Sequence, residues 1–543
     1  MLYNSNPLAR VFDLVKQEKN LLYAIYFYAI FMGGIQLSLP LGIQSIINFV
    51  MAGSFSMSLA LLITLVVAGV FITGLLQVSQ MKVIETIRQR IFVTHAYLMA
   101  ERLPRLDLKK TDSYYLPELV NRFFEIPNLQ KSWAKLLLDL PTAAIQILFG
   151  LILLSFYHPA FILFGIVLLL LLWLMIAATG KKGLETSIEA SNHKYTVAAW
   201  LEELARSIKT FKFSKGSALH LRRADDTTSN YVSARTRHFS ILLLQYKVLV
   251  AFKTIITAAM LVVGAVLLLH QQMNIGQFIA SEIVILTIIA AVEKIIVNLD
   301  SVYQIFTSVD KIAKVIEKPV ESSGTTAVSR AQKVAVSFRN VSFGYRENQP
   351  VLNAMSFDIA AGDKVCIRGR DGSGKTTLLK LMTGAYLDFT GSLLINNIPI
   401  SNYDMASLRS ETGIFLNQQE IFEGSLLENI TMGAEAVNYD EIMTLARQLG
   451  LQEYITQLKE GFNTPLDTSG KRLPANVVHK VLLVRALINQ PRLILLEEPF
   501  TLLEEPYRSN LKQWLLGQAE TTVIVVTNDS DFALQCHQTI HLN

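Results

Sequence analysis

The sequence predicts two structural classes in one chain: an all-α, six-helix transmembrane domain followed by an α/β P-loop domain. Three observations support this prediction. Hydrophobic residues make up 51% of the 543 residues and charged residues only 17%, an apolar balance that suggests a membrane portion. Long apolar runs fill the first 318 residues. Shorter strand-like and helix-like runs then alternate around the glycine-rich stretch Gly369–Thr376.

Six apolar runs are each near the roughly 20 residues needed to cross a bilayer. They are Leu21–Val50, Met57–Gln80, Leu136–Tyr157, Pro159–Thr179, Tyr246–His270 and Gly276–Asn298. Pro40 lies inside the first run and is expected to kink that helix without ending it. The two long connections are helix-patterned, so we expect membrane helices that extend well past the bilayer.

The distribution of basic residues predicts the orientation of the spans. Lys and Arg are frequent between spans two and three and between spans four and five, and absent from the three short connections. By the positive-inside rule the long connections and both chain ends are cytoplasmic. The net charge of +5 gives no argument for nucleic acid, and the two cysteines, Cys366 and Cys536, suggest no disulfide framework. The polar N-terminus does not predict a removable signal peptide.

A change of composition marks the boundary between the two predicted domains. Pro, Ser, Gly and Thr cluster in Lys318–Thr326, as in a linker. We therefore predict a transmembrane domain over 1–318, a linker over 319–332 and an α/β domain over 333–543. Strands are expected in the α/β domain at Val334–Phe338, Ser392–Ile395, Leu493–Leu496 and Val523–Val526.

The stretch Gly369–Thr376 fits the phosphate-binding motif G-x-x-x-x-G-K-[ST]. It follows an apolar strand, Lys364–Ile367, and opens a helix, Thr377–Met382. Glycines let backbone N–H groups face a phosphate, and the helix N-terminus adds partial positive charge. Lys375 can reach the β- and γ-phosphates, and the Thr376 hydroxyl can bind Mg²⁺. We predict a site for ATP and Mg²⁺ formed by Gly369, Asp371, Gly372, Ser373, Gly374, Lys375, Thr376 and Thr377.

Six spans with two long cytoplasmic connections, followed by a P-loop domain, resemble one half of an ABC exporter over essentially the whole chain. In Phe343-Gly344-Tyr345, which resembles the A-loop, Tyr345 would stack on adenine; a tyrosine at the end of a core strand is the alternative. In Phe415–Gln418, which resembles the Q-loop, Gln418 would contact Mg²⁺ and the attacking water, with Gln419 as the rival.

Leu493–Glu498 resembles the Walker B strand, which ends in two carboxylates. Glu497 stands where the family usually has the Asp that orients Mg²⁺-bound water, and its extra methylene is expected to loosen the metal shell. Glu498 matches the general base or water-positioning residue. A solvated acidic pair at a strand end is the alternative.

Three further motifs depart from the family pattern. The signature Leu-Ser-Gly-Gly-Gln corresponds to Leu473–Val477, in which Pro474 has neither a hydroxyl nor an N–H group. The D-loop corresponds to Thr501–Glu504, and the switch histidine to Asn528, which can donate a hydrogen bond but carries no imidazole charge. Together these departures predict ATP binding with weak hydrolysis.

The resemblance implies ATP-dependent export across the cytoplasmic (inner) membrane, together with a second half-transporter in a homodimer or heterodimer. Glu85–Phe92 looks similar to bacterial peptide or protein secretion (type I secretion-like) exporters, whose partners include a periplasmic adaptor and an outer-membrane channel. Coupling helices are expected near Tyr114–Phe123 and Trp200–Phe213. The competing hypothesis is an ATP-binding, hydrolysis-deficient membrane subunit that senses nucleotide or regulates a partner without transporting.

Overall fold

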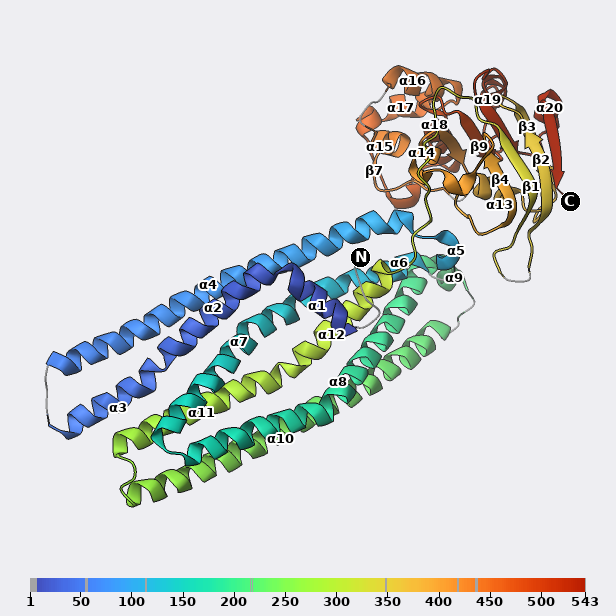
Figure 1. Ribbon diagram of the computed structural model, residues 1–543. Coiled ribbons are helices and arrows are strands. Elements are labelled where there is room, and N and C mark those ends of the chain that lie inside the picture. The colour runs from blue at the N-terminus through green and yellow to red at the C-terminus, as the bar shows by residue number, and fades with distance from the viewer. Residues whose placement is uncertain are drawn as a thin grey trace. The chain divides into compact units, whose positions relative to one another are not determined.

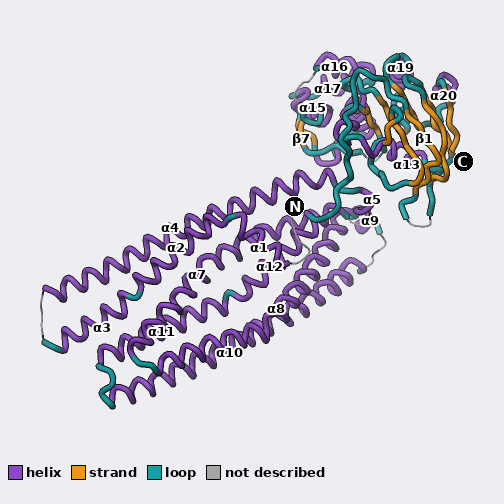
Figure 2. The backbone as a smooth tube through the Cα atoms, viewed as in Figure 1, coloured by secondary structure: helices purple, strands orange, loops and turns teal. Residues whose placement is uncertain are grey.

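The computed structural model divides the chain into two compact units, and each is described by itself. It describes residues 7–53, 57–112, 115–214, 216, 218–346, 349–417, 419–434 and 438–542. Unit 1 comprises residues 1–104 and 114–318, and unit 2 comprises residues 105–113 and 319–543. Unit 1 is helical, whereas unit 2 combines strands with helices (Figures 1 and 2).

Among its described residues, unit 1 contains six segments that are long and apolar enough to cross a membrane. Their helices are α2 (Lys19–Gln36) with α3 (Ser38–Met51), α4 (Met57–Arg102), α7 (Glu125–Tyr157), α8 (Ala160–Arg206), α10 (Leu219–Leu269), and α11 (Ile275–Val297) with α12 (Leu299–Ile316). The 51 residues of α10 span about 75 Å at about 1.5 Å per residue, more than twice a hydrocarbon core of about 30 Å. The predictions of six transmembrane helices and of long helical extensions are both confirmed.

The first span is divided at Leu37. α2 ends at Gln36 and α3 begins at Ser38, and Leu37 itself keeps right-handed helical angles (φ −66°, ψ −20°). Pro40 lies four residues after Gln36 and has no N–H group to bond the Gln36 carbonyl oxygen. The first span nevertheless runs through this point from Lys19 to Met51, so the expectation that Pro40 would not end the span is confirmed.

Two hydrophobic cores stabilise unit 1. One joins α2, α4, α7 and α12 through buried side chains such as Ile25, Ile87 and Leu129. The other joins α7, α8, α10 and α11, and α8 runs along α10 in Figure 1. The remaining short helices are α1 (Pro7–Gln17), α6 (Leu116–Val120) and α9 (Ile208–Phe213), with 3₁₀ turns at Leu103–Arg105 and Asn121–Phe124.

Unit 2 contains two main sheets together with helices, and the predicted α/β class is confirmed. The parallel sheet has the order β11-β3-β10-β9-β6, and the antiparallel sheet has the order β2-β1-β4-β5. The strands of the parallel sheet are β3 (Lys364–Gly369), β6 (Thr412–Phe415), β9 (Leu493–Glu497), β10 (Thr522–Val526) and β11 (Gln538–Leu542). The others are β1 (Val336–Phe343), β2 (Leu352–Ile359), β4 (Thr390–Ile395) and β5 (Ile398–Pro399), with the small pair β7 (Gly424–Ser425) and β8 (Pro465–Leu466).

Helices surround the parallel sheet (Figure 1). They are α13 (Lys375–Met382), α14 (Met405–Ser410), α15 (Leu426–Thr431), α16 (Tyr439–Gln448), α17 (Gln452–Gln457), α18 (Ala475–Leu487), α19 (Tyr507–Leu516) and α20 (Ser530–Gln535). β9 and β10 are buried along their whole lengths, which explains their nearly continuous Leu, Ile and Val sequences.

A short segment from the first part of the chain belongs to unit 2. It carries the helix α5 (Leu108–Thr111), which is N-capped by the Asp107 carboxylate. The Asp107 N–H group donates to the Pro319 carbonyl oxygen at 3.0 Å, and the Glu321 N–H group donates to the Arg105 carbonyl oxygen at 2.8 Å. These backbone bonds join α5 to the chain that enters unit 2 at residue 319.

Candidate nucleotide-binding site

The predicted site residues come together at one edge of the parallel sheet. β3, β10, β9 and β6 all run in the same direction, so their carboxyl ends share this edge. The P-loop follows β3, Thr527 and Asn528 follow β10, and Glu497 ends β9. Open parallel sheets bind ligands at the carboxyl ends of their strands.

The P-loop has the backbone geometry that its glycines permit. Gly372 and Gly374 have positive φ angles of 82° and 90°, a region that side-chain-bearing residues rarely adopt. A Cβ atom on Gly374 would also lie 2.7 Å from Leu352 Cδ2. Because Gly374 immediately precedes α13, this loop leads directly into a helix N-terminus, which favours anions.

Lys375 lies over the loop that precedes it. Its Nζ atom donates to the carbonyl oxygens of Gly369 at 2.7 Å and Arg370 at 2.8 Å. Asp371 is fully exposed, and its Oδ1 atom is 3.8 Å from Lys375 Nζ. The Lys375 ammonium group therefore lies close to the position where the motif places phosphate.

Glu497 and Thr376, the two described residues predicted to hold the metal, are in contact. The Thr376 hydroxyl donates to Glu497 Oε1, and the Asn417 N–H group donates to Glu497 Oε2 at 3.0 Å. Glu497 is 6% exposed, and the length of its side chain allows both oxygens to be bound. Hydroxyl and carboxylate oxygens are ligands that Mg²⁺ prefers, so the side chains of Thr376 and Glu497 fit this ion.

Glu498 lies beside Glu497 in an unusual backbone conformation, with a positive φ of 46°. Its Oε2 atom accepts a hydrogen bond from the Thr527 hydroxyl at 3.1 Å. Burial raises the pKa of Glu498 above its ordinary value, although Thr527 and the Lys375 charge act in the opposite direction. A raised pKa brings a carboxylate closer to the range that suits a general base at neutral pH.

These groups line one cavity of about 330 Å³. Its lining residues are Val351, Asp371, Gly372, Gly374, Lys375, Thr376, Thr377, Asn417, Glu497, Glu498 and Val526. The combination of a glycine loop, a lysine, a hydroxyl and two carboxylates fits a nucleoside triphosphate with its Mg²⁺. Sequence reasoning missed Asn417 and Val351; the position of Asn417 at the end of β6 could have indicated the former.

Tyr345 belongs to an aromatic cluster next to the P-loop helix. Its hydroxyl oxygen lies 3.1 Å from Thr377 Oγ1, and its ring makes edge contacts with Phe343 and Tyr386. Lys109 of α5 joins this cluster, with its Nζ atom 5.2 Å from the Phe343 ring centroid and 2.8 Å from Asp388 Oδ2. Lys109 was not among the residues that the sequence predicted for this site.

The Q-loop assignment is not settled by the geometry. Gln418 lies outside the residues that the structure describes. The rival Gln419 bonds within its own turn, where its N–H group donates to the Leu416 carbonyl oxygen at 3.1 Å. Both assignments therefore remain predictions.

The N-terminus of α18 carries the segment Leu473–Val477. Pro474 is the N-cap residue, and α18 begins at Ala475. The Val477 N–H group is occupied locally, by the Asn476 side-chain oxygen and by the Pro474 carbonyl oxygen, each at 2.9 Å. This helix start folds normally, but fewer of its N–H groups point to an outside anion than in a helix with a glycine-rich start.

The D-loop and the switch position are both held through backbone atoms. The Leu503 carbonyl oxygen accepts from Arg508 at 2.9 Å, and the Asn528 carbonyl oxygen accepts from Arg368 at 3.2 Å. The Asn528 side chain is exposed and lies two residues after the end of β10. Asn528 is not among the residues that line the cavity, so its contact with a phosphate stays a prediction.

Comparisons with known proteins agree with this arrangement. The family model described as the ABC transporter transmembrane region matches residues 22–292, and the model described as ABC transporter matches residues 352–501. The chain is similar in fold to a bacterial Atm1-family ABC exporter with ATP bound, with a TM-score of 0.82 and 18% identity over 97% of this chain and 94% of the other.

Curated relatives include bacterial toxin exporters. The alpha-hemolysin translocation ATP-binding protein HlyB of Escherichia coli O157:H7 is 28% identical over 307 residues, 56% of this chain and 44% of the relative. The Toxin RTX-I translocation ATP-binding protein of Actinobacillus pleuropneumoniae is 27% identical over 335 residues, 61% of this chain and 47% of the relative. The uncharacterized ABC transporter ATP-binding protein YknV of Bacillus subtilis is 30% identical over 280 residues, 50% of this chain and 45% of the relative.

The match spans less than half the length of each of these curated relatives. The two family models nevertheless cover both units, in the order that the structure has them. The chain therefore belongs to the ABC transporter family, with a transmembrane region and an ATP-binding region in one polypeptide and the fold of an ABC exporter.

Proposed function

We propose that this chain is one half of a dimeric, ATP-dependent exporter of a bacterial inner membrane, with both chain ends in the cytoplasm. The observation that carries the proposal is the cavity at Lys375, Thr376, Glu497 and Glu498 in the same chain as six span-length helices. We divide the chain into a transmembrane domain over 1–318, a linker over 319–332 and an ATP-binding domain over 333–543. Its partner is a second half-transporter, identical or different.

We propose a peptide or protein as the exported substrate. The proposal is supported by the relatives whose names state toxin translocation. A periplasmic adaptor and an outer-membrane channel are proposed partners on the same ground. An export assay in cells that carry or lack candidate adaptors tests this assignment, and export that is independent of every adaptor would contradict it.

We propose a role for each of these site residues. Lys375 and the N–H groups before α13 hold the phosphates, and Tyr345 stacks on adenine. Thr376 and Glu497 hold Mg²⁺, with Gln418 as a further contact; the ion neutralises phosphate charge when bound. Glu498 accepts the proton of the attacking water, helped by the raised pKa that burial gives it.

We further propose that turnover is weak when this chain pairs with itself. Both sites of such a dimer would use an α18 N-terminus that starts at Pro474 and a switch position occupied by Asn528. Preorganised N–H donors to a reacting oxyanion contribute roughly 10²–10³ in rate, so losing even one is consequential. With an ordinary partner, both sites would be mixed: one would pair this chain's P-loop with an intact signature, and the other would pair the partner's P-loop with Leu473–Val477.

Nucleotide binding and phosphate release by the purified full-length chain in nanodiscs test the proposal. We expect Mg²⁺-ATP binding and slow hydrolysis that increases with a suitable partner half-transporter. Glu498→Gln should retain ATP binding and lose turnover, whereas Lys375→Ala should lose binding. Lys333→Ala serves as a lysine control, since Lys333 pairs with exposed Glu520. Fast hydrolysis by the wild type alone would contradict weak turnover, and a lack of ATP binding would contradict the whole proposal.

A second candidate function is an ATP-binding subunit that senses nucleotide or regulates a partner without transporting. The local occupation of the Val477 N–H group at the start of α18 favours it. Reconstitution with every candidate partner half-transporter distinguishes the two functions. ATP binding without turnover in any combination would support the sensor, whereas partner-dependent hydrolysis with transport would support the exporter.

A further inference from the structure

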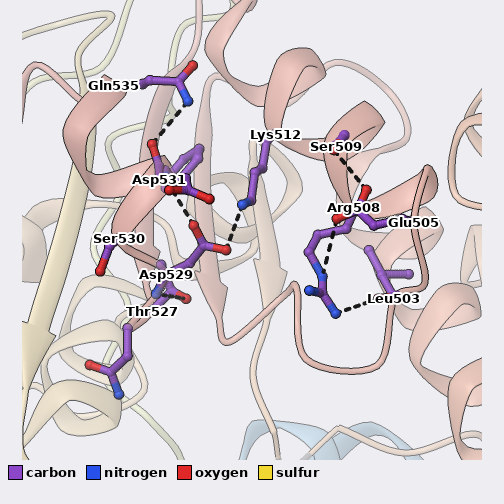
Figure 3. A network of polar contacts seen from close by, with 12 residues as sticks. Leu503, Glu505, Arg508, Ser509, Lys512, Thr527, Asp529, Ser530, Asp531 and Gln535 are labelled. Atoms are coloured by element: carbon purple, nitrogen blue, oxygen red, sulfur yellow. Dashed lines mark hydrogen bonds and ion pairs between the residues drawn. The ribbon is translucent and has the colours of Figure 1, made fainter.

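Helix α19 is linked to two loops next to the proposed nucleotide site by cationic side chains. Arg508 and Lys512 are four residues apart and therefore share one face of the helix. Figure 3 shows the Lys512 ammonium group pointing to Asp529, and the Arg508 guanidinium group close to Leu503 and Glu505. Neither cation lines the cavity itself. Any effect of these residues on the nucleotide must therefore pass through the loops that they hold.

Lys512 and Asp529 form a short ion pair that is largely shielded from water. The distance between Lys512 Nζ and Asp529 Oδ2 is 2.6 Å, and the side chains are 14% and 20% exposed. Asp529 Oδ1 accepts from the Phe532 N–H group at 2.9 Å and so caps α20. Lys512 Nζ also lies 5.5 Å from the centroid of the Phe500 ring. This lysine is thus fixed by a carboxylate and an aromatic ring at once.

Asp529 is connected to Glu498 by two further hydrogen bonds. The Asp529 N–H group donates to Thr527 Oγ1 at 3.2 Å, and the Thr527 hydroxyl donates to Glu498 Oε2 at 3.1 Å. Asn528 lies between the two linked residues. A displacement of Asp529 would therefore move the Asn528 amide and release the hydrogen bond to Glu498.

Arg508 holds the other loop. Its Nη2 atom donates to the Leu503 carbonyl oxygen at 2.9 Å, and Leu503 is 2% exposed. The Arg508 N–H group donates to the Glu504 carbonyl oxygen at 3.0 Å. The loop at Thr501–Glu504 is thus joined to the first turn of α19, one helical turn before Lys512.

We propose that Lys512 is a positioning residue for the nucleotide site. Its ion pair with Asp529 fixes the segment Thr527–Asp529, and thereby places the Asn528 amide and the Glu498 carboxylate at the γ-phosphate. Since Arg508 is on the same face, α19 moves this segment and the Thr501–Glu504 loop as one body. The inference rests on the proposed function, in which Asn528 contacts the γ-phosphate.

The affinities for Mg²⁺-ATP and Mg²⁺-ADP, measured on the full-length chain in nanodiscs with fluorescent nucleotides, test this role without requiring turnover. ADP lacks the γ-phosphate, so a misplaced Asn528 should weaken ATP binding alone. The variants are Lys512→Met, Lys512→Arg, Asp529→Asn and Asn528→Ala. Asp529→Asn removes the charge but keeps a good helix N-cap, which guards against a folding defect. Lys333→Met is the control, because it removes a Lys–Glu pair in the same unit that is exposed.

We expect Asn528→Ala to lower the preference for ATP over ADP roughly fivefold, the value of one hydrogen bond. Lys512→Met and Asp529→Asn should give a loss of roughly threefold to fivefold in the same preference, with ADP affinity unchanged. Lys512→Arg should retain most of the preference, and Lys333→Met all of it. The double variant Lys512→Met with Asn528→Ala should be no worse than Asn528→Ala alone, since both changes remove the same contact.

Each contrary result has a separate meaning. If Asn528→Ala affects the preference but Lys512→Met and Asp529→Asn do not, the positioning role is overturned and the proposed function stands. Additive losses in the double variant would overturn it as well, because Lys512 would then act elsewhere. If Asn528→Ala has no effect, the assignment of Asn528 as the switch residue fails, and the role of Lys512 fails with it.

Discussion

The P-loop and the start of α18 are both helix N-termini where an ABC protein contacts phosphate, yet they are built differently in this chain. α13 is preceded by Gly374, which has a φ of 90° and no side chain. α18 is preceded by Pro474, which has no N–H group, and the Asn476 side chain accepts from the next N–H group in the helix. The first helix start is open to an anion, whereas the second is partly satisfied by its own residues.

The difference teaches that holding a nucleotide and completing its hydrolysis need separate parts. The P-loop side has a lysine, a hydroxyl and two carboxylates around one cavity. The α18 side has a stable helix start without the donors that a reacting phosphate needs. We therefore expect a change at Lys375 to affect binding, whereas changes at Glu498 or at the start of α18 should affect turnover with binding preserved.

The largest expected effect follows from Lys375→Ala. The ammonium group supplies charge-assisted hydrogen bonds to phosphate, each worth about 1.5–3 kcal/mol, so ATP affinity should fall about 100-fold or more. Nucleotide titration of the full-length chain measures the loss, with Lys333→Ala as the control. An unchanged affinity would mean that the cavity at Gly369–Thr376 does not bind ATP.

The second prediction concerns the start of α18. Replacing Pro474, Ala475 and Asn476 together by Ser, Gly and Gly should raise the turnover of the chain alone about tenfold or more, because N–H and hydroxyl donors return to the phosphate. ATP affinity should change less than twofold. Phosphate release and nucleotide titration on the same preparation separate the two quantities. A gain in ATP affinity without a gain in turnover would contradict the proposal that the P-loop governs binding and the start of α18 governs turnover.

The third prediction concerns the pH dependence of turnover. Burial raises the pKa of Glu498, and the Thr527 hydroxyl opposes this rise. A base must be ionised, so turnover should fall on acidification, and it should do so at a higher pH than for an ordinary glutamate. Thr527→Val removes the opposing hydrogen bond and should move the acid limb of the turnover profile to higher pH. At pH 6 the turnover of the variant should be lower than that of the wild type by less than about tenfold.

Turnover measured from pH 5.5 to 8.5, with ATP affinity measured at the same pH values, checks this third prediction. The affinity should stay nearly constant, since neither Glu498 nor Thr527 is needed to hold the nucleotide. Identical acid limbs in the wild type and Thr527→Val would show that Glu498 does not control the profile.

The sequence was sufficient for the elements with strong local signals. The six apolar runs and the strands β9 and β10 appear where continuous apolar residues predicted them, because burial on all sides demands such residues. The P-loop could also be predicted from the sequence, since its glycines indicate a backbone geometry that few other residues adopt.

Features that depend on contacts between residues far apart in the chain could not be predicted from local sequence. Nothing local in Lys109 indicates that α5 joins unit 2 and meets Phe343 and Asp388. The same holds for Lys512 and Asp529, which are 17 positions apart in sequence and meet only in the folded chain. Pro40 indicated an irregularity in the first span, but its position at Leu37 was not predicted, because a proline affects the residues before it.

The smallest expected effect tests how α18 is held. His479, in the second turn of α18, is 7% exposed, and its Nε2 atom bonds the Pro499 carbonyl oxygen at 2.8 Å. Burial lowers the pKa of His479, so below pH 6.5 the unfolded chain takes up a proton that the folded chain does not. The stability contributed by keeping this histidine neutral is therefore present above pH 6.5. It is lost on acidification, by at most about 1.4 kcal/mol per pH unit.

Hydrogen exchange of peptides from α18, followed by mass spectrometry at pH 7.5 and pH 5.5, measures this loss in the full-length chain after correction for the intrinsic exchange rates. His479→Gln can still donate to the Pro499 carbonyl oxygen but does not titrate, so its protection should change less between the two pH values. The P-loop helix α13 is the internal reference, because its buried face contains no histidine. If α13 and α18 lose protection equally on acidification, the acid sensitivity does not come from His479. The stability of α18 would then depend on pH no more than that of the P-loop helix α13.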